Sequence, residues 1–395
     1  MKYIYFLTAF LLLSPLYGQK IRTMNKGRAA AKNYAVTIPY KDIRGLAITE
    51  VIINGKIYTF MVDTGAVTAI SPQLYEELQL SSAANLEITD SGNLARSMKV
   101  VTMPDISVGG LVFKDIPAAV TGESPFFQCL GIDGFLGSNL MRNSIVKFSH
   151  KSKTITFTDK HEEFDLDKKK GFDLGLDKMQ SNPHLGAVFN SGDKKINETL
   201  LFDSGMTGFY ETSLNGYINK IKGSNIFTVL NEAEGSLSLG INGVAPNSMQ
   251  YRLLLPDMKL AGATFKNVTV NTTDSNNSRI GAELLHYGDV IIDYPGKKFY
   301  FRPYSIGEID MGEKNWPVQP VIKDGKFVIG IVWDPAFNEE ILLGDEILSF
   351  GEIDYESITV CDAFTTVLRP KDDIALIRLK DVNTGEIKEV ELVRR

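Results

Sequence analysis

The sequence carries two copies of one strand-and-turn pattern, which favours a fold built from two similar halves. The first copy, YTFMVDTGAVTAIS (58–71), is a run of strand-forming residues that ends on an aspartate. The second copy, LLFDSGMTGFYE (200–211), has the same apolar lead-in, aspartate, hydroxyl residue and glycine. Turn capping explains one such triplet, but its duplication at corresponding places favours a chemical role. The candidate loop residues are Asp63, Thr64, Gly65 and Ala66 in the first copy, and Asp203, Ser204, Gly205 and Met206 in the second.

Two more pairs of segments extend the repeat. MPDISVGGLVFKDIPAAV (103–120) aligns without gaps to LPDMKLAGATFKNVTVNT (255–272). Residues 134–157 are similar to residues 278–301, since both have an apolar residue and a glycine, a short amphipathic stretch, and two strands around a turn that contains lysine. A third triplet, Asp90-Ser91-Gly92, has a polar lead-in and no repeat partner, so it is predicted to be a hairpin turn.

The paired motifs VDTGA with GFLGSNL, and FDSGM with RIGAELL, resemble the two halves of a retropepsin-like aspartic protease fused into one chain. The resemblance covers about residues 36–304. It implies a mostly β fold with two pseudo-symmetric β-barrel lobes, 36–158 and 183–306, and an active-site cleft between them. The charged residues 159–182 are predicted to connect the lobes on the surface.

The resemblance also implies a mechanism. Asp63 and Asp203 would lie side by side, share one proton and activate a water against the peptide bonds of an extended polypeptide. The hydroxyls of Thr64 and Ser204 would cross to the opposite loop. Residues 89–96 and 234–243 would form hairpins over the cleft. The partner segments that would pack beside the loops contribute Leu136, Gly137, Ile280 and Gly281. No metal or cofactor is expected.

Three residues modify this expectation. Ala66 stands where pepsin-like members have a hydroxyl that stabilises the carboxylate anion, so we predict optimal activity at about pH 5 to 7. Met206 stands where the family usually has a small residue, and Arg279 where it has an apolar one. These two departures leave open a catalytically inactive relative that only binds extended peptide.

Residues 314–395 resemble a PDZ domain, with LLGDEILSFGEID as the strand and turn that carry the resemblance. The segment that would bind a peptide carboxylate, 316–325, has no glycine in its loop and contains Pro317 and Pro320, which have no backbone N–H to donate. A structural or docking role is therefore favoured over capture of peptide C-termini. A third alternative is a PDZ-type adaptor whose β lobes are only a scaffold.

The remaining features bear on compartment and partners. Residues 1–18 have the layout of a secretory signal peptide, which predicts export to a bacterial periplasm or the cell exterior. The net charge of −6 argues against nucleic acid, and no later stretch predicts membrane insertion. Cys129 and Cys361 lie far apart in different modules, so no disulfide is expected. The four histidines lie apart without metal-ligand spacing: His150, His161, His184 and His286.

Overall fold

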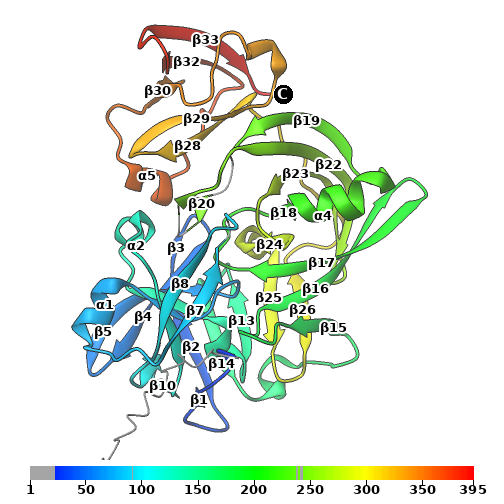
Figure 1. Cartoon of the computed structure of the whole chain (residues 1–395). Helices are drawn as coiled ribbons and strands as arrows, with labels where there is room; N and C mark the ends of the chain where they lie inside the picture. Colours follow the sequence, from blue (N-terminus) through cyan, green and yellow to red (C-terminus); the bar gives the residue numbers. More distant parts are fainter. Residues whose placement is uncertain (1–22, 91, 237–238, 241–242) are drawn as a thin grey trace, which may run out of the picture.

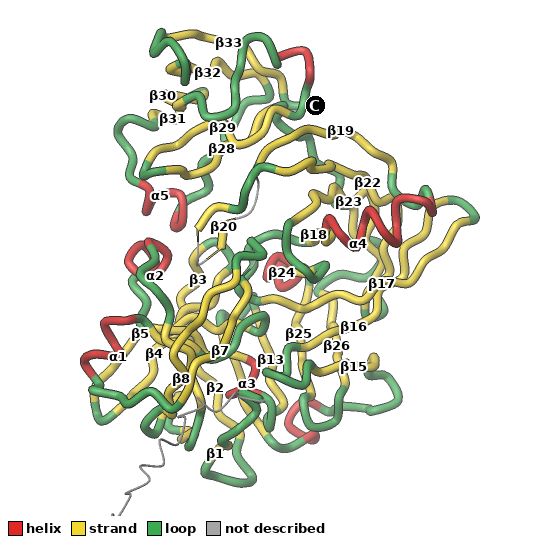
Figure 2. Tube along the Cα trace, viewed as in Figure 1, coloured by secondary structure: helices red, strands yellow, loops and turns green. Residues whose placement is uncertain are grey.

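The computed structural model describes residues 23–90, 92–236, 239–240 and 243–395. The predicted signal peptide lies outside these residues. The prediction of a mostly β chain is confirmed, since the helices are few and short and the strands form barrel-like sheets (Figure 2). Among the described residues, no helix has both the length and the apolar character that crossing a membrane requires.

The first β region contains the first aspartate loop and forms a sheet of its own, with the path β1-β10-β9-β4-β5-β12-β6-β11-β8-β7 and β3 paired to β4. The strands of the first β region are β1 (Arg28–Ala29), β3 (Lys41–Ile43), β4 (Leu46–Ile53), β5 (Lys56–Asp63), β6 (Ala69–Ile70), β7 (Ala84–Thr89), β8 (Ala95–Thr102), β9 (Ile106–Val108), β10 (Leu111–Lys114), β11 (Pro117–Val120) and β12 (Gly134–Gly137). Its helices are α1 (Pro72–Glu77), α2 (Pro125–Leu130) and α3 (Ser138–Met141).

The second β region contains the second aspartate loop and is built mainly on the long ribbon of β22 and β23 (Figure 1, green to yellow). Its strands are β16 (Pro183–Ser191), β17 (Lys194–Asp203), β18 (Tyr210–Ser213), β19 (Thr228–Gly235), β20 (Leu239–Gly240), β21 (Gly243–Val244), β22 (Ser248–Leu260), β23 (Ala263–Thr273), β24 (Arg279–Gly281) and β27 (Ile309–Asp310). Its helical turns are α4 (Leu214–Gly216), η2 (Tyr217–Ile221), η3 (Lys222–Ser224) and η4 (Ala282–His286).

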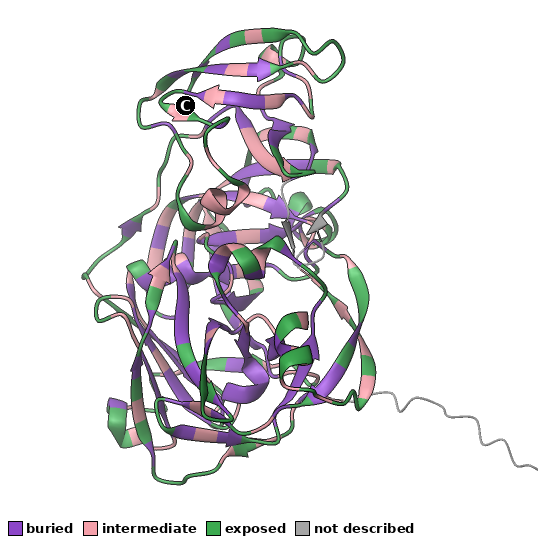
Figure 3. Ribbon diagram, turned by 90° about the vertical axis from the view of Figure 1, so that its left-hand side faces the viewer, coloured by how far each residue is buried: buried purple, intermediate pink, exposed green. Residues whose placement is uncertain are grey.

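A platform of strands joins the two β regions. Its order is β2-β14-β13-β25-β26-β15, with β13 and β25 antiparallel at the centre. One apolar core runs through both β regions and this platform, so the three parts pack as one body (Figure 3). The platform strands are β2 (Ala35–Pro39), β13 (Ile145–Ser149), β14 (Thr154–Thr158), β15 (Phe172–Leu176), β25 (Gly288–Asp293) and β26 (Lys298–Pro303), with η1 (His161–Phe164) between β14 and β15.

The C-terminal module has a separate core around Trp316, Ile347 and Ile377. It meets the second β region where Gly235 of β19 pairs with Ile331 of β29. The module consists of β28 (Val318–Lys323), β29 (Lys326–Val332), η5 (Pro335–Phe337), β30 (Glu346–Phe350), β31 (Ile353–Asp354), α5 (Val360–Thr365), β32 (Ile374–Lys380) and β33 (Ile387–Val393).

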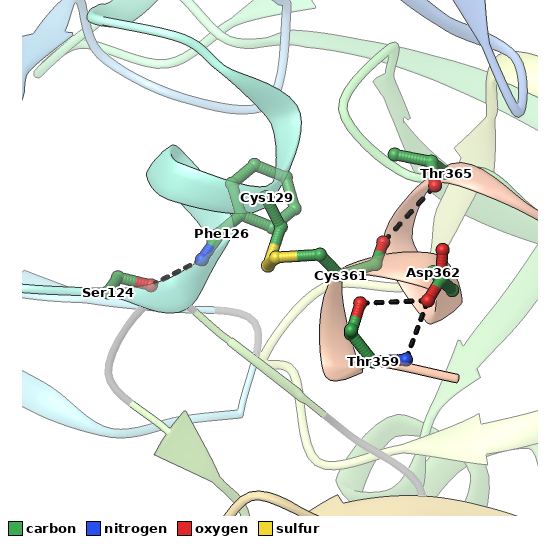
Figure 4. The surroundings of a disulfide bond; sticks show 7 residues. All are labelled: Ser124, Phe126, Cys129, Thr359, Cys361, Asp362 and Thr365. Carbon is green, nitrogen blue, oxygen red and sulfur yellow. Dashed lines mark hydrogen bonds between the residues drawn. A yellow bond between two sulfur atoms is a disulfide. The ribbon is translucent and has the colours of Figure 1, made fainter. Parts of the chain in front are cut away.

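The expectation that the two cysteines stay apart is wrong, because Cys129 and Cys361 form a disulfide (Figure 4). Cys129 lies in α2 of the first β region and Cys361 in α5 of the C-terminal module, and the two short helices face each other. The rings of Phe126 and Phe364 pack edge to face beside the bond, with centroids 5.7 Å apart. The disulfide therefore fastens the module to the first β region, although the chain runs into the module from the second.

Candidate active site

The two aspartates end corresponding strands. Asp63 is the last residue of β5 and Asp203 the last of β17, and the residues before them are buried. β5 runs parallel to β12 with Asp63 opposite Gly137, and β17 runs parallel to β24 with Asp203 opposite Gly281. Each aspartate loop therefore begins beside its own partner segment.

Reciprocal hydrogen bonds join the two loops. Thr64 Oγ1 donates to the carbonyl oxygen of Phe202 (2.6 Å) and accepts from Ser204 N (3.0 Å). Ser204 Oγ donates to the carbonyl oxygen of Val62 (2.9 Å) and accepts from Thr64 N (3.0 Å). Both hydroxyls are buried, so these bonds hold the loops in one relative position.

This arrangement brings the two carboxyl groups within hydrogen-bonding reach of each other. Asp63 is 9% exposed and Asp203 7%. Burial, and then the neighbouring charge of Asp203, raises the pKa of Asp63 well above its ordinary value. Gly65 N donates to Asp63 Oδ1 (2.8 Å) and Gly205 N to Asp203 Oδ1 (3.0 Å). The pair can hold one proton at a pH where isolated carboxyls hold none.

The other predicted site residues pack beside these loops. Leu136 and Ile280 are fully buried in β12 and β24. Ser138 N donates to Ala66 O (3.0 Å), and Ala282 N donates in the same way to Met206 O (2.8 Å). The loops and partner segments thus pair by equivalent hydrogen bonds in the two β regions.

Met206 and Arg279, the two residues of the second β region that differ from the family pattern, lie in different places. Met206 is 7% exposed and its side chain lies near Gly208 and Gly281, and it is not among the described residues that line the cleft. Arg279 does line the cleft. Its Nη1 lies 3.2 Å from Asp203 Oδ2 and its Nη2 lies 2.6 Å from Glu211 Oε2. The sequence alone identifies Arg279 as unusual, but only the folded structure shows that it contacts an aspartate of the dyad.

The cleft beside the carboxyl groups is a cavity of ≈ 390 Å³. The β7–β8 hairpin forms one wall, and Asp90 caps its turn by accepting from Gly92 N and Leu94 N. Asn276 Nδ2 of the second β region donates to Asn93 Oδ1 at this turn (2.9 Å), so the hairpin reaches across the cleft. Sequence reasoning did not identify Phe126 of α2 or Asn182, both of which line the cleft.

The second predicted hairpin, 234–243, is described only in part. β20 and β21 pair within it, and Ser236 N donates to Gly330 O of the C-terminal module (3.1 Å). Gly235 packs so closely on Gly330 O that a β-carbon there would clash. The described base of this hairpin therefore contacts the module.

A larger cavity of ≈ 1110 Å³ lies between the C-terminal module and the second β region. β28 and the segment after α5 line it on one side, and Arg252 and Glu211 on the other. Arg252 is buried, stacks on Trp333 and donates to Trp316 O (2.9 Å). Arg252 thus joins the second β region to the module beside this cavity.

The expectation that the histidines stay apart fails for one pair. The ring centroids of His150 and His286 lie 4.2 Å apart, and His150 contacts Lys153 and Asp42. Across the described residues, however, no group of three or more histidine, cysteine, aspartate or glutamate side chains could hold a metal ion.

The match to a family model agrees with the place of the first aspartate loop. Residues 49–140, which include Asp63 and its partner segment, match the family model described as aspartyl protease. This match supports a protease of the aspartic class. The chain is also similar to a solved structure, a retropepsin-like aspartic protease from Rickettsia conorii, at 19% identity over 33% of this chain and 94% of that one, with a TM-score of 0.23. No curated protein matches it.

Proposed function

We propose that this protein is an aspartic endopeptidase that hydrolyses peptide bonds of extended polypeptides with Asp63 and Asp203 as its catalytic dyad. The observation that carries the proposal is the reciprocal bonding of Thr64 and Ser204, which joins two buried aspartate loops. We further propose that the two β regions are pseudo-symmetric lobes, because the register that sets Asp63 opposite Gly137 recurs for Asp203 and Gly281.

The reaction follows from the shared proton. The ionised carboxylate takes a proton from water as the water oxygen attacks the peptide carbonyl carbon. The protonated carboxyl gives its proton to the carbonyl oxygen, and a tetrahedral diol forms. A proton then passes to the leaving nitrogen, the C–N bond breaks, and the dyad regains one proton from the diol. The substrate would lie under the β7–β8 hairpin, against a first lobe that presents apolar side chains such as Met61, Ile88 and Phe135.

Two finer assignments accompany this proposal. We assign the C-terminal module to the PDZ type, with a docking role supported by the disulfide and by the bond from Arg252 to Trp316 O. We also propose export, because a disulfide is typical of oxidising compartments and residues 1–18 read as a signal peptide. N-terminal sequencing of the mature protein from cell fractions tests the second assignment.

Cleavage of a quenched random peptide library from pH 3 to 8 tests the proposed activity. The wild type should cut, and Asp63→Asn and Asp203→Asn should each be inactive. Cleavage that survives both substitutions would show that the catalytic residues lie elsewhere.

One observation favours a second candidate, an inactive relative that only binds extended peptide. The ion pair of Arg279 with Asp203 places a cation on the dyad, at a position where the family usually has an apolar residue. Peptide binding by a correctly folded wild type that never cleaves the library would support it. A function that persists unchanged in both aspartate variants would instead indicate an adaptor with the lobes as scaffold.

A further inference from the structure

Arg279 occupies the position that corresponds to Phe135 in the other β region. In the parallel pairing of β5 with β12, Phe135 stands opposite Met61, two residues before the pair of Asp63 with Gly137. In the pairing of β17 with β24, Arg279 stands opposite Leu201, two residues before Asp203. Both side chains line the cleft. At these corresponding positions the Asp63 side of the dyad has an aromatic ring and the Asp203 side has a guanidinium.

The guanidinium is held in place by a second acid. Glu211 of β18 stands directly opposite Arg279 on the antiparallel neighbour β24, and its Oε2 lies 2.6 Å from Nη2. The Arg279 side chain is 11% exposed, and its Nε is buried with no hydrogen-bond partner among the described residues. Removal from water is costly for a cation, and the nearby charges of Glu211 and Asp203 offset this cost and raise the pKa of Arg279 above its ordinary value.

The contact with the dyad is one-sided. Asp203 accepts from Gly205 N through Oδ1 and faces Arg279 through Oδ2. Asp63 accepts from Gly65 N in the same way, but no cation of the described chain forms an ion pair with it, and burial and the charge of Asp203 outweigh the effect of the Arg279 charge on its pKa. Arg279 is also the sole cation among the described residues that line the cleft. The other charged or titratable groups near the dyad are Glu211, the hairpin carboxyls Glu87 and Asp90, and the hydroxyl of Tyr294 behind Ser138.

We propose that Arg279, oriented by Glu211, is a positioning residue that fixes Asp203 as the ionised member of the dyad and leaves the shared proton on Asp63. A neighbouring cation stabilises a carboxylate, whereas a buried carboxyl without one keeps its proton. The proposal rests on the proposed function and gives each aspartate its task. Asp203 takes the proton from water, while Asp63 gives its proton to the carbonyl oxygen. Asp203 then protonates the leaving nitrogen, and Asp63 regains a proton from the diol.

A titration of the carboxyl carbons tests this assignment without any substrate. Protein labelled with ¹³C at aspartate Cγ is followed by NMR from pH 2 to 9, and each dyad signal is assigned by its loss in Asp63→Asn or Asp203→Asn. Of the two dyad signals, that of Asp63 should titrate at the higher pH. In Arg279→Met the separation between the two midpoints should shrink, because the cation that distinguishes the two carboxyl groups is removed. Arg279→Lys should restore most of the difference.

The wild-type titration decides the assignment even where Arg279→Met does not fold. The proposal would be overturned if the two wild-type midpoints came in the reverse order. It would also be overturned if Arg279→Met had the same midpoints as the wild type. Peptide cleavage provides a separate readout, in which the acidic limb of the kcat/KM profile should move to higher pH in Arg279→Met. If the two NMR signals titrate in the predicted order but the protein cleaves no peptide, the proposed protease activity is rejected and the assignment of charge within the dyad stands.

Discussion

At the scale of single residues, two glycines lie against the carboxyl groups of the opposite loops. A β-carbon on Gly205 would lie 2.5 Å from Asp63 Oδ2, and one on Gly65 would lie 2.5 Å from Asp203 Oδ1. A β-carbon at either position would force the facing carboxyl group to shift. Neither position has a positive φ, so the constraint comes from the close approach rather than from backbone conformation.

Gly205→Ala should therefore reduce kcat/KM by about a hundredfold or more, since a misplacement of catalytic groups by about 1 Å can cost that much. Gly223→Ala is the matched control, because a β-carbon on Gly223 meets no atom within 4 Å. Equal activity of Gly205→Ala and the control would contradict the close packing of the loops.

The buried carboxyl pair predicts how stability depends on pH. The folded protein raises the pKa of Asp63 above its ordinary value of 3.8, so the folded state binds a proton more tightly than the unfolded chain. The unfolding free energy should then fall as the pH rises from 3.8 through the raised pKa. Asp63→Asn keeps the oxygen that accepts from Gly65 N and removes the like charge.

We thus expect Asp63→Asn to melt a few °C above the wild type at pH 8 and close to it at pH 4, as measured by calorimetry, since about 1 kcal/mol shifts Tm by a few degrees in a domain of this size. A variant less stable than the wild type at pH 8 would show that repulsion between the two carboxyl groups does not destabilise the folded protein.

At the scale of elements, the strands and loops of the site could be predicted from their residues, but their cross-contacts could not. The buried lead-in before Asp63 has strand composition and ends at a turn, which is local information. The repeat then predicted that Asp203 has an equivalent place. The ion pair between Arg279 and Glu211 depends on which strand lies beside β24, and no local pattern specifies that neighbour. The direction of the Met206 side chain likewise follows from packing, which no local pattern specifies.

The crossed hydroxyls should couple the two loops energetically. Thr64→Val and Ser204→Ala each remove two hydrogen bonds of a buried hydroxyl, so each should lower Tm measurably. Because both variants break the same network, the double variant should lose less unfolding free energy than the sum of the two single losses. The coupling energy should be about 0.5–3 kcal/mol. Thr102→Val on the exposed side of β8 is the control. Strictly additive losses would show that the loops are held independently.

At the scale of the whole molecule, the disulfide joins parts that the sequence places in separate modules. Cys129 and Cys361 are 232 residues apart, and their meeting depends on how the C-terminal module docks on the first β region. Composition and spacing contain no information on that docking. α2 also contributes Phe126 to the cleft wall, and the Phe126 ring contacts both Phe135 of β12 and Phe364 of α5. The disulfide thus connects the module to one wall of the cleft.

Reduction of this bond should destabilise the protein by about 2–5 kcal/mol, the usual range for loss of a native disulfide. Calorimetry with and without dithiothreitol measures the effect. Cys129→Ser/Cys361→Ser should melt where the reduced wild type melts and should be insensitive to reductant. A thiol assay on unfolded, unreduced wild type should find no free thiol, and two free thiols there would contradict the bond itself.

The central claim is that Asp63 and Asp203 act as one catalytic unit, and a comparison of three variants tests it most directly. The measurement is kcat/KM on the best library peptide for Asp63→Asn, Asp203→Asn and the double variant, beside the wild type. Residues that act as a unit give non-additive losses, so each single variant should be as inactive as the double variant. A single variant that keeps a substantial part of the wild-type rate would contradict the claim, because one carboxyl would then suffice.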